Sequence, residues 1–138
     1  MPETSSLIPS PPDQIWAILA DPLRWPEWTP TVSRVEALDG PTLAIGGRFR
    51  LEQPRLSPAV WTVTELEEGQ SFTWVSRSPG VVATALHRLR AAEGGQTRVE
   101  LAVQFSGPLG WLVGLVAGRL TQDYIEQEAA ALAKRCAS

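Results

Sequence analysis

Cysteine is almost absent from this chain of 138 residues, in which Cys136 is the only one. A single cysteine excludes a disulfide framework within the chain. One cysteine and one histidine also provide too few ligands for a structural zinc site, so no metal is expected. The first residues, MPETSSLIPSPP, lack both the basic and the apolar region of a secretory signal. Together these absences predict a cytoplasmic protein.

Neither an excess of positive charge nor an apolar segment of membrane length is present. Twelve Lys and Arg residues stand against fifteen Asp and Glu residues, a net charge of -3, which predicts no attraction to nucleic acid or anionic lipid. The apolar stretch PLGWLVGLVAG, residues 108–118, is about half as long as the ~20 residues of a spanning helix. We interpret this stretch as a buried helical turn and expect no stable membrane insertion.

The composition is that of one soluble globular domain covering residues 1–138, with 43% hydrophobic and 20% charged residues. Helical spacing and prolines in the first turn predict a short helix over residues 10–19, with Ser10 as its N-cap. Two prolines limit residues 21–28 to a turn or one tight helical turn. Strands are expected at residues 31–38, 47–53, 59–67, 71–78, 81–91 and 97–105, and a final helix at 109–134.

Short connections rich in glycine and proline separate the expected strands, and connections of this length join antiparallel neighbours. We therefore predict an α+β fold in which an antiparallel meander is crossed by the final helix. The glycine turns GGRFR and EGGQ neither match a phosphate-binding fingerprint nor precede a helix, so no cofactor is expected.

The only histidine, His87, lies in the stretch ATALHRLRAA, where apolar and charged residues alternate. Side chains two apart share a face of a strand, so His87 is expected on the inward face with Ala85 and Leu89. Arg88 and Arg90 fall on the opposite face. Whether the inward face is a solid core or a ligand cavity decides what the protein does.

Three segments carry a resemblance to a known superfamily: IPSPPDQIWAILADPLRWPEWTPTV, EGGQTRVEL and GPLGWLVGLVAGRLTQDYIEQEAAAL. In combination they resemble the START, polyketide cyclase and birch-pollen-allergen-like superfamily (SRPBCC), over essentially the whole chain. The resemblance implies a helix-grip fold, a curved antiparallel sheet wrapped around a long C-terminal helix, with two short helices after the first strand. It also implies binding of lipids, hormones or polyketides, with cyclisation or dehydration catalysed by a few members.

In such a fold one helix cannot fill the concave face of a strongly curved sheet, so a gap remains that suits an apolar ligand. The six tryptophans provide large rigid contact surfaces, although each aromatic residue also has a plain interpretation as core. Trp25 and Trp28 are either a lid or wall of this cavity or a seal for the sheet end. The expected lining is Trp25, Trp28, Phe49, Leu51, Trp61, Trp74, Ser76, His87, Leu89, Val103, Phe105, Leu112, Val116, Leu120 and Tyr124.

His87 is the strongest candidate for chemistry, because a dry cavity keeps an imidazole neutral and able to accept a proton. The alternative is a buried histidine that is satisfied by a hydroxyl or a backbone carbonyl. Tyr124 and Arg119 are candidates to stabilise an enolate in an enzyme. Arg119 alternatively extends along apolar surface to water.

The leading hypothesis is binding of a small hydrophobic molecule, such as a lipid, a polyketide or a related aromatic metabolite. The second is a polyketide cyclase or dehydratase that positions a reactive chain and uses His87 as a proton shuttle. The third is an interaction module whose cavity is filled by its own side chains, with WLVGLVAG forming a homodimer or partner surface. Trp111 fits either packing under the final helix or that surface.

Overall fold

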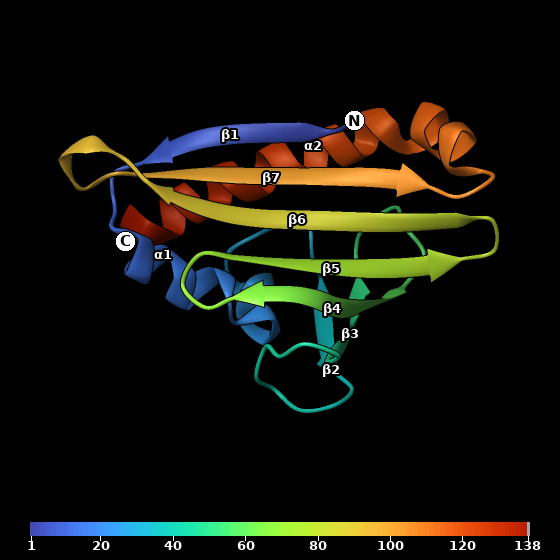
Figure 1. The fold of residues 1–138 in the computed structure, drawn as a ribbon, viewed down its shortest axis with the longest axis horizontal. Helices are drawn as coiled ribbons and strands as arrows, with labels where there is room; N and C mark the ends of the chain where they lie inside the picture. The colour runs from blue at the N-terminus through green and yellow to red at the C-terminus, as the bar shows by residue number, and fades with distance from the viewer. Residues whose placement is uncertain (138) are drawn as a thin grey trace.

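The computed structural model describes residues 1–137, which form one antiparallel sheet and a long helix across it (Figure 1). The sheet has seven strands in the order β1-β7-β6-β5-β4-β3-β2, so β1 closes against β7 and the others follow the chain. This arrangement confirms the predicted α+β helix-grip fold. The strands are β1 (Glu3–Ile8), β2 (Arg34–Ala37), β3 (Arg48–Glu52), β4 (Ala59–Glu67), β5 (Ser71–Ser78), β6 (Val81–Ala91) and β7 (Thr97–Ser106). The helices are α1 (Pro12–Leu19), the 3-10 helices η1 (Pro22–Glu27) and η2 (Glu93–Gly95), and α2 (Gly110–Ala137).

Periodicity locates the strands better than it locates the start of the first helix. β4, β5 and β6 have the predicted bounds, whereas β2 and β3 are shorter than predicted. The prediction of Ser10 as N-cap is wrong, because α1 follows Pro11, which has no side-chain cap. The N–H of Ser10 donates to the carbonyl of Ile8 at 2.8 Å, and the hydroxyl of Thr97 donates to the carbonyl of Ser10 at 2.7 Å. Ser10 therefore belongs to the turn that leaves β1.

The two halves of α2 pack differently against the sheet. In Figure 1 α2 runs behind the sheet, and its C-terminal end lies beside α1. Ile125, Ala129 and Leu132 are buried there, within the hydrophobic core shared by α1 and the sheet. Between Gly110 and Tyr124, no residue of α2 is fully buried. The first half of the helix is therefore less closely packed, and a space remains between it and the sheet.

The apolar stretch at residues 108–118 is not the buried turn that the sequence predicts. Trp111 is 66% exposed, Leu115 76% and Val116 79%, so the largest side chains of this stretch point to solvent. A helix presents only one face to the sheet, and the remaining apolar positions of an all-apolar stretch must face outward. Within residues 1–137, no helix combines the length and the hydropathy that crossing a membrane requires.

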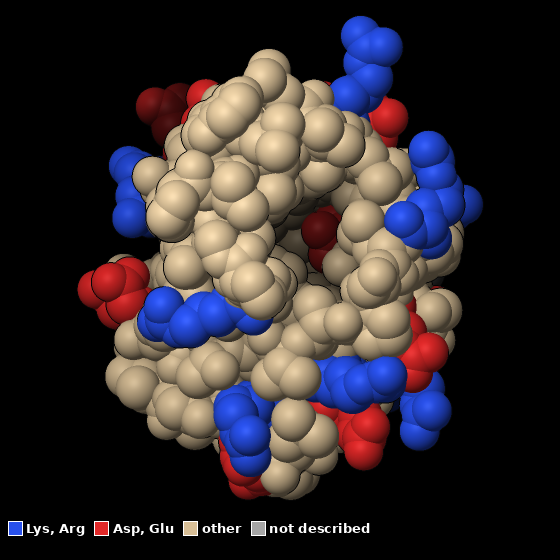
Figure 2. All heavy atoms as spheres, turned by 90° about the vertical axis from the view of Figure 1, so that its right-hand side faces the viewer, with Lys and Arg blue, Asp and Glu red and all other residues tan. Residues whose placement is uncertain are grey.

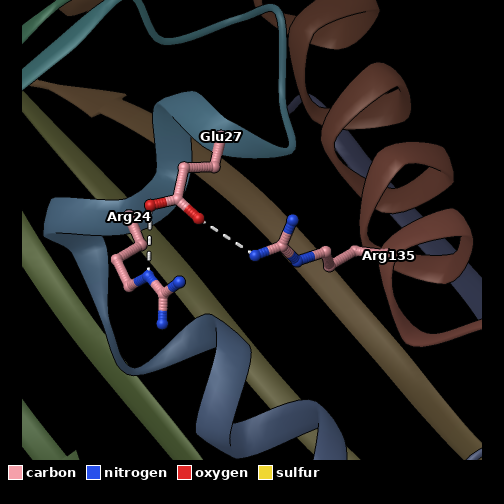
Figure 3. Close-up of polar contacts among 3 residues, drawn as sticks. All are labelled: Arg24, Glu27 and Arg135. Atoms are coloured by element: carbon pink, nitrogen blue, oxygen red, sulfur yellow. Dashed lines mark hydrogen bonds and ion pairs between the residues drawn. The ribbon is translucent and has the colours of Figure 1, made fainter. Parts of the chain in front are cut away.

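An ion-pair cluster fastens the C-terminal end of α2 to η1 (Figure 3). Arg24 Nε donates to Glu27 Oε2 at 3.1 Å, and Arg135 Nη2 donates to Glu27 Oε1 at 3.0 Å. The hydrogen bond from Arg24 is the main cause that lowers the pKa of Glu27. Because water and salt screen these exposed groups, the cluster orients α2 more than it stabilises the fold.

Candidate ligand-binding cavity

A cavity of about 280 Å³ lies between the sheet and α2. Its walls are mainly apolar, and Trp25, Trp61 and Trp74 provide large rigid surfaces. Figure 2 shows the molecule hollowed on the face that forms the right-hand side of Figure 1. The side chains of the protein leave this space unfilled, so the expectation of a closed cavity in the third hypothesis is not met.

Most of the strand residues predicted to line the cavity do so. The predicted residues found in its wall are Trp25, Leu51, Trp61, Trp74, Ser76, His87, Val103, Phe105 and Tyr124. Two-residue alternation placed the strand residues among them correctly because only one face of the sheet meets the helix, whereas Trp25 lies on η1 and Tyr124 on α2. Contact of any of them with a ligand stays a prediction.

Trp28, Phe49 and Leu89 were also predicted to line the cavity, and the structure places them outside its wall. Trp28 packs edge-on behind Trp25, with ring centroids 6.0 Å apart. Phe49 is fully buried and packs against Trp74 at 6.0 Å, and Leu89 is a core residue. The inward face of the sheet is longer than the cavity, so an inward position alone does not make a lining residue.

The cavity-facing positions predicted on α2 before Tyr124 are wrong, because each lies one residue too early in the chain. Leu112, Val116, Leu120 and Arg119 do not line the cavity, and Leu112, Val116 and Arg119 are exposed. The residues that do line it precede Tyr124 as Val113, Ala117 and Thr121. The inward positions carry the smaller side chains, because large side chains there would occupy the cavity.

His87 is buried in the cavity wall at 7% exposure. Its ring stacks on Phe72 with centroids 4.1 Å apart and planes 7° from parallel. Nδ1 lies 3.3 Å from the carbonyl oxygen of Phe72, which can only accept, so Nδ1 carries the proton and Nε2 is left as an acceptor. Burial lowers the pKa of His87 to about 4, so the ring is neutral at neutral pH.

The hydroxyl of Tyr124 donates to the carbonyl of Pro54, in the loop between β3 and β4. Gln53 donates from Nε2 to the carbonyl of Thr31 at 3.2 Å, which ties the start of the same loop to the chain before β2. Gln53, Leu56 and Ser57 of this loop line the cavity. Tyr124 therefore holds one wall of the cavity in place. Its only hydroxyl proton is used in the hydrogen bond to Pro54.

Replacing Tyr124 by Phe should loosen residues 53–58 and leave the rest of the fold intact. The lost hydrogen bond is expected to cost about 1 kcal/mol of unfolding free energy. Hydrogen exchange followed by mass spectrometry should show faster exchange in residues 53–58, with β5 and β6 unchanged. Exchange that stays as slow as in the wild type would contradict the role of Tyr124 in holding the loop.

Glu128 also lines the cavity, and it was not among the residues predicted from the sequence. It is the only Asp or Glu in the described part of the wall, and Figure 2 shows acidic atoms within the hollow. Burial raises the pKa of Glu128 to about 7. The available signal was its spacing: Glu128 follows Tyr124 by four residues and so shares its helix face.

The family model for polyketide cyclase / dehydrase and lipid transport matches residues 3–137. No curated protein matches the chain. A hypothetical protein from Helicobacter pylori has a similar structure, with a TM-score of 0.83 and 12% identity over 97% of this chain and 86% of that one. Ara h 8.0201 gives a TM-score of 0.68 and 17% identity over 97% of this chain and 94% of its own.

Norcoclaurine synthase from Thalictrum flavum, in complex with dopamine and hydroxybenzaldehyde, gives a TM-score of 0.74 and 12% identity. That match covers 96% of this chain and 83% of the synthase. At such identities the structural likeness shows the shared fold alone, whereas the family match spans almost the whole sequence. On this match, the chain belongs to the polyketide cyclase / dehydrase and lipid transport family, within the SRPBCC superfamily.

Proposed function

We propose that the protein binds a small hydrophobic molecule, such as a lipid, a polyketide or a related aromatic metabolite, in the cavity between the sheet and α2. The observation that carries this proposal is the unfilled cavity of about 280 Å³ beneath a helix face of small residues. Protein interiors are close-packed, and an empty apolar space costs stability. A ligand that occupies the space would recover part of that cost.

The enzyme alternative has one observation in its favour, the position of His87 in the cavity wall. A polyketide cyclase or dehydratase that used His87 as its proton shuttle would need a base matched to neutral pH. Burial lowers the pKa of His87 to about 4, which makes the ring a weak proton acceptor at neutral pH. This low pKa weighs against His87 as the proton shuttle. Binding is therefore the function that the site supports best.

Filling the cavity tests the proposal directly. Ala117→Phe should place a ring in the cavity and weaken binding of decanol by about tenfold or more, because the ring and the ligand compete for the same space. Val116→Phe is the matched control, since Val116 is the preceding residue and is 79% exposed. Isothermal titration of both variants should show a loss for Ala117→Phe only. Equal affinities in two folded variants would contradict binding in this cavity.

Native mass spectrometry of the purified protein, with solvent extraction of a denatured sample, would identify the class of any co-purifying molecule. We expect an apolar molecule with the wild type and with Val116→Phe, and none with Ala117→Phe. The same spectra test whether the exposed face of α2 supports a homodimer.

A further inference from the structure

Glu128 stands apart from the rest of the cavity wall because it is the only carboxylic acid among the described wall residues. The described residues of the wall include no Lys, Arg or Asp, and the other titratable side chains are His87 and Tyr124. Within residues 1–137, the carboxyl group of Glu128 has no hydrogen bond or ion pair. An ionised carboxylate without a partner in an apolar cavity is unfavourable.

The elements packed against α2 offer Glu128 no counter-charge. His87 on β6 is neutral, and the hydroxyl of Tyr124 is bonded to Pro54. The charged groups of β6 and β7 alternate onto the outer face of the sheet, and those of β1 and α1 are exposed. These charged groups are Arg88, Arg90, Arg98, Glu100, Glu3 and Asp13. In the two other segments that contact α2, Arg55 of the loop next to Pro54 is exposed, and Arg24 of η1 pairs with Glu27.

We propose that Glu128 is the polar anchor of the cavity, and that the ligand is an apolar molecule whose polar group is a hydrogen-bond donor, an amine or a hydroxyl, and not a carboxylate. This inference rests on the proposed function and narrows its ligand class. A donor would give the Glu128 oxygens the partner that the protein does not supply. A carboxylate would add a second negative charge to an apolar space or force one of the two acids to take up a proton.

Three probes with the same ten-carbon chain separate these cases: decylamine, decanol and decanoate. Their apolar parts are identical, so differences in affinity report the polar group. Wild-type protein at pH 7.5 should bind decylamine at least tenfold more tightly than decanoate, with decanol between them. The Ala117→Phe variant serves as the control for binding of a cationic amine to the outer surface.

Glu128→Gln keeps the size of the side chain and one acceptor oxygen, replaces the other oxygen by an NH2 donor, and removes the charge. We expect this variant to bind decylamine about tenfold more weakly and decanoate about tenfold more tightly, with little change for decanol. Glu126→Gln is the matched control, because Glu126 is an exposed acid two residues earlier on the same helix. Removing its charge should leave the order of the three affinities unchanged.

The same probes should respond to pH in the wild type. Decylamine and decanoate keep their charges between pH 6 and 8, whereas Glu128, with a pKa of about 7, ionises across that range. The affinity for decylamine should rise several-fold and that for decanoate should fall, and Glu128→Gln should abolish both trends.

A wild type that binds decanoate as tightly as decylamine, or a Glu126→Gln variant that shifts the affinities like Glu128→Gln, would overturn the role of Glu128. Binding of decanol that Ala117→Phe removes would still support the cavity itself. Failure of all three probes to bind the wild type and Glu128→Gln would overturn both proposals.

Discussion

In the Glu128→Gln variant, the free energy of unfolding is expected to rise with pH between about pH 5 and 6.5. In the wild type it should change little over the same range. The reason is that two groups in the cavity wall, the buried His87 and the half-buried Glu128, titrate in opposition. Burial lowers the pKa of His87 from 6.5 to about 4, and burial raises the pKa of Glu128 from 4.5 to about 7. Each shift corresponds to at most about 3 kcal/mol across its pH window, less where water enters the cavity.

The signs follow from which state binds more protons. Between about pH 4 and 6.5 the unfolded chain protonates His87 and the folded protein does not, so the His87 contribution to stability rises with pH. Between about pH 4.5 and 7 the folded protein keeps the Glu128 proton and the unfolded chain does not, so that contribution falls. The two slopes largely cancel in the wild type.

In each single variant, the pH dependence that the remaining group gives to the free energy of unfolding should no longer be cancelled. Urea unfolding at pH 5, 6 and 7 should give a rising free energy of unfolding for Glu128→Gln and a falling one for His87→Gln. Glu27 and Asp39, whose pKa values are lowered by Arg24 and Arg48, lose their contributions mainly below this range. Profiles for both variants that parallel the wild type would contradict the opposed pKa shifts of His87 and Glu128.

The strands were predictable because their sheet has one face toward α2 and one toward solvent. Alternation with a period of two then identifies the inward residue at each position, and His87 lies on the inward face as predicted. The start of α1 was less predictable. Ser10 has the residue type of an N-cap, but its backbone N–H and carbonyl form hydrogen bonds in the turn after β1. Local propensity loses there to a tertiary hydrogen bond.

The cavity face of α2 was not predictable from hydrophobicity. Between residues 110 and 118 the helix carries no polar or charged side chain on any side, so no single apolar stripe marks the inward face. Large residues normally mark the buried face, and here Leu112 and Val116 are exposed while Ala117 and Thr121 face the cavity. Glu128 escaped prediction for a related reason, since an acid on a helix is ordinarily solvated.

Trp25→Ala should lower the free energy of unfolding by about 4 kcal/mol, as expected for removal of a buried aromatic ring. Trp25 is 1% exposed, and its Nε1 donates to the carbonyl of Leu19 at 3.0 Å, which ties η1 to the end of α1. Its ring also packs against Trp74 and His87, with centroids 5.2 and 5.8 Å away. The variant therefore loses a ring contact network and leaves a carbonyl without its donor.

Trp111→Ala is the matched control, because it removes the same side chain from a position that is 66% exposed. Urea unfolding should show a loss below about 0.5 kcal/mol for this surface substitution. Since Trp25 forms part of the cavity wall, its removal should also enlarge the cavity by the volume of an indole ring. Added indole should then raise the melting temperature of Trp25→Ala and not that of Trp111→Ala, because a ligand that binds only the folded state stabilises it. Equal losses of stability in the two variants, or indole stabilising both alike, would contradict the placement of Trp25 between the core and the cavity.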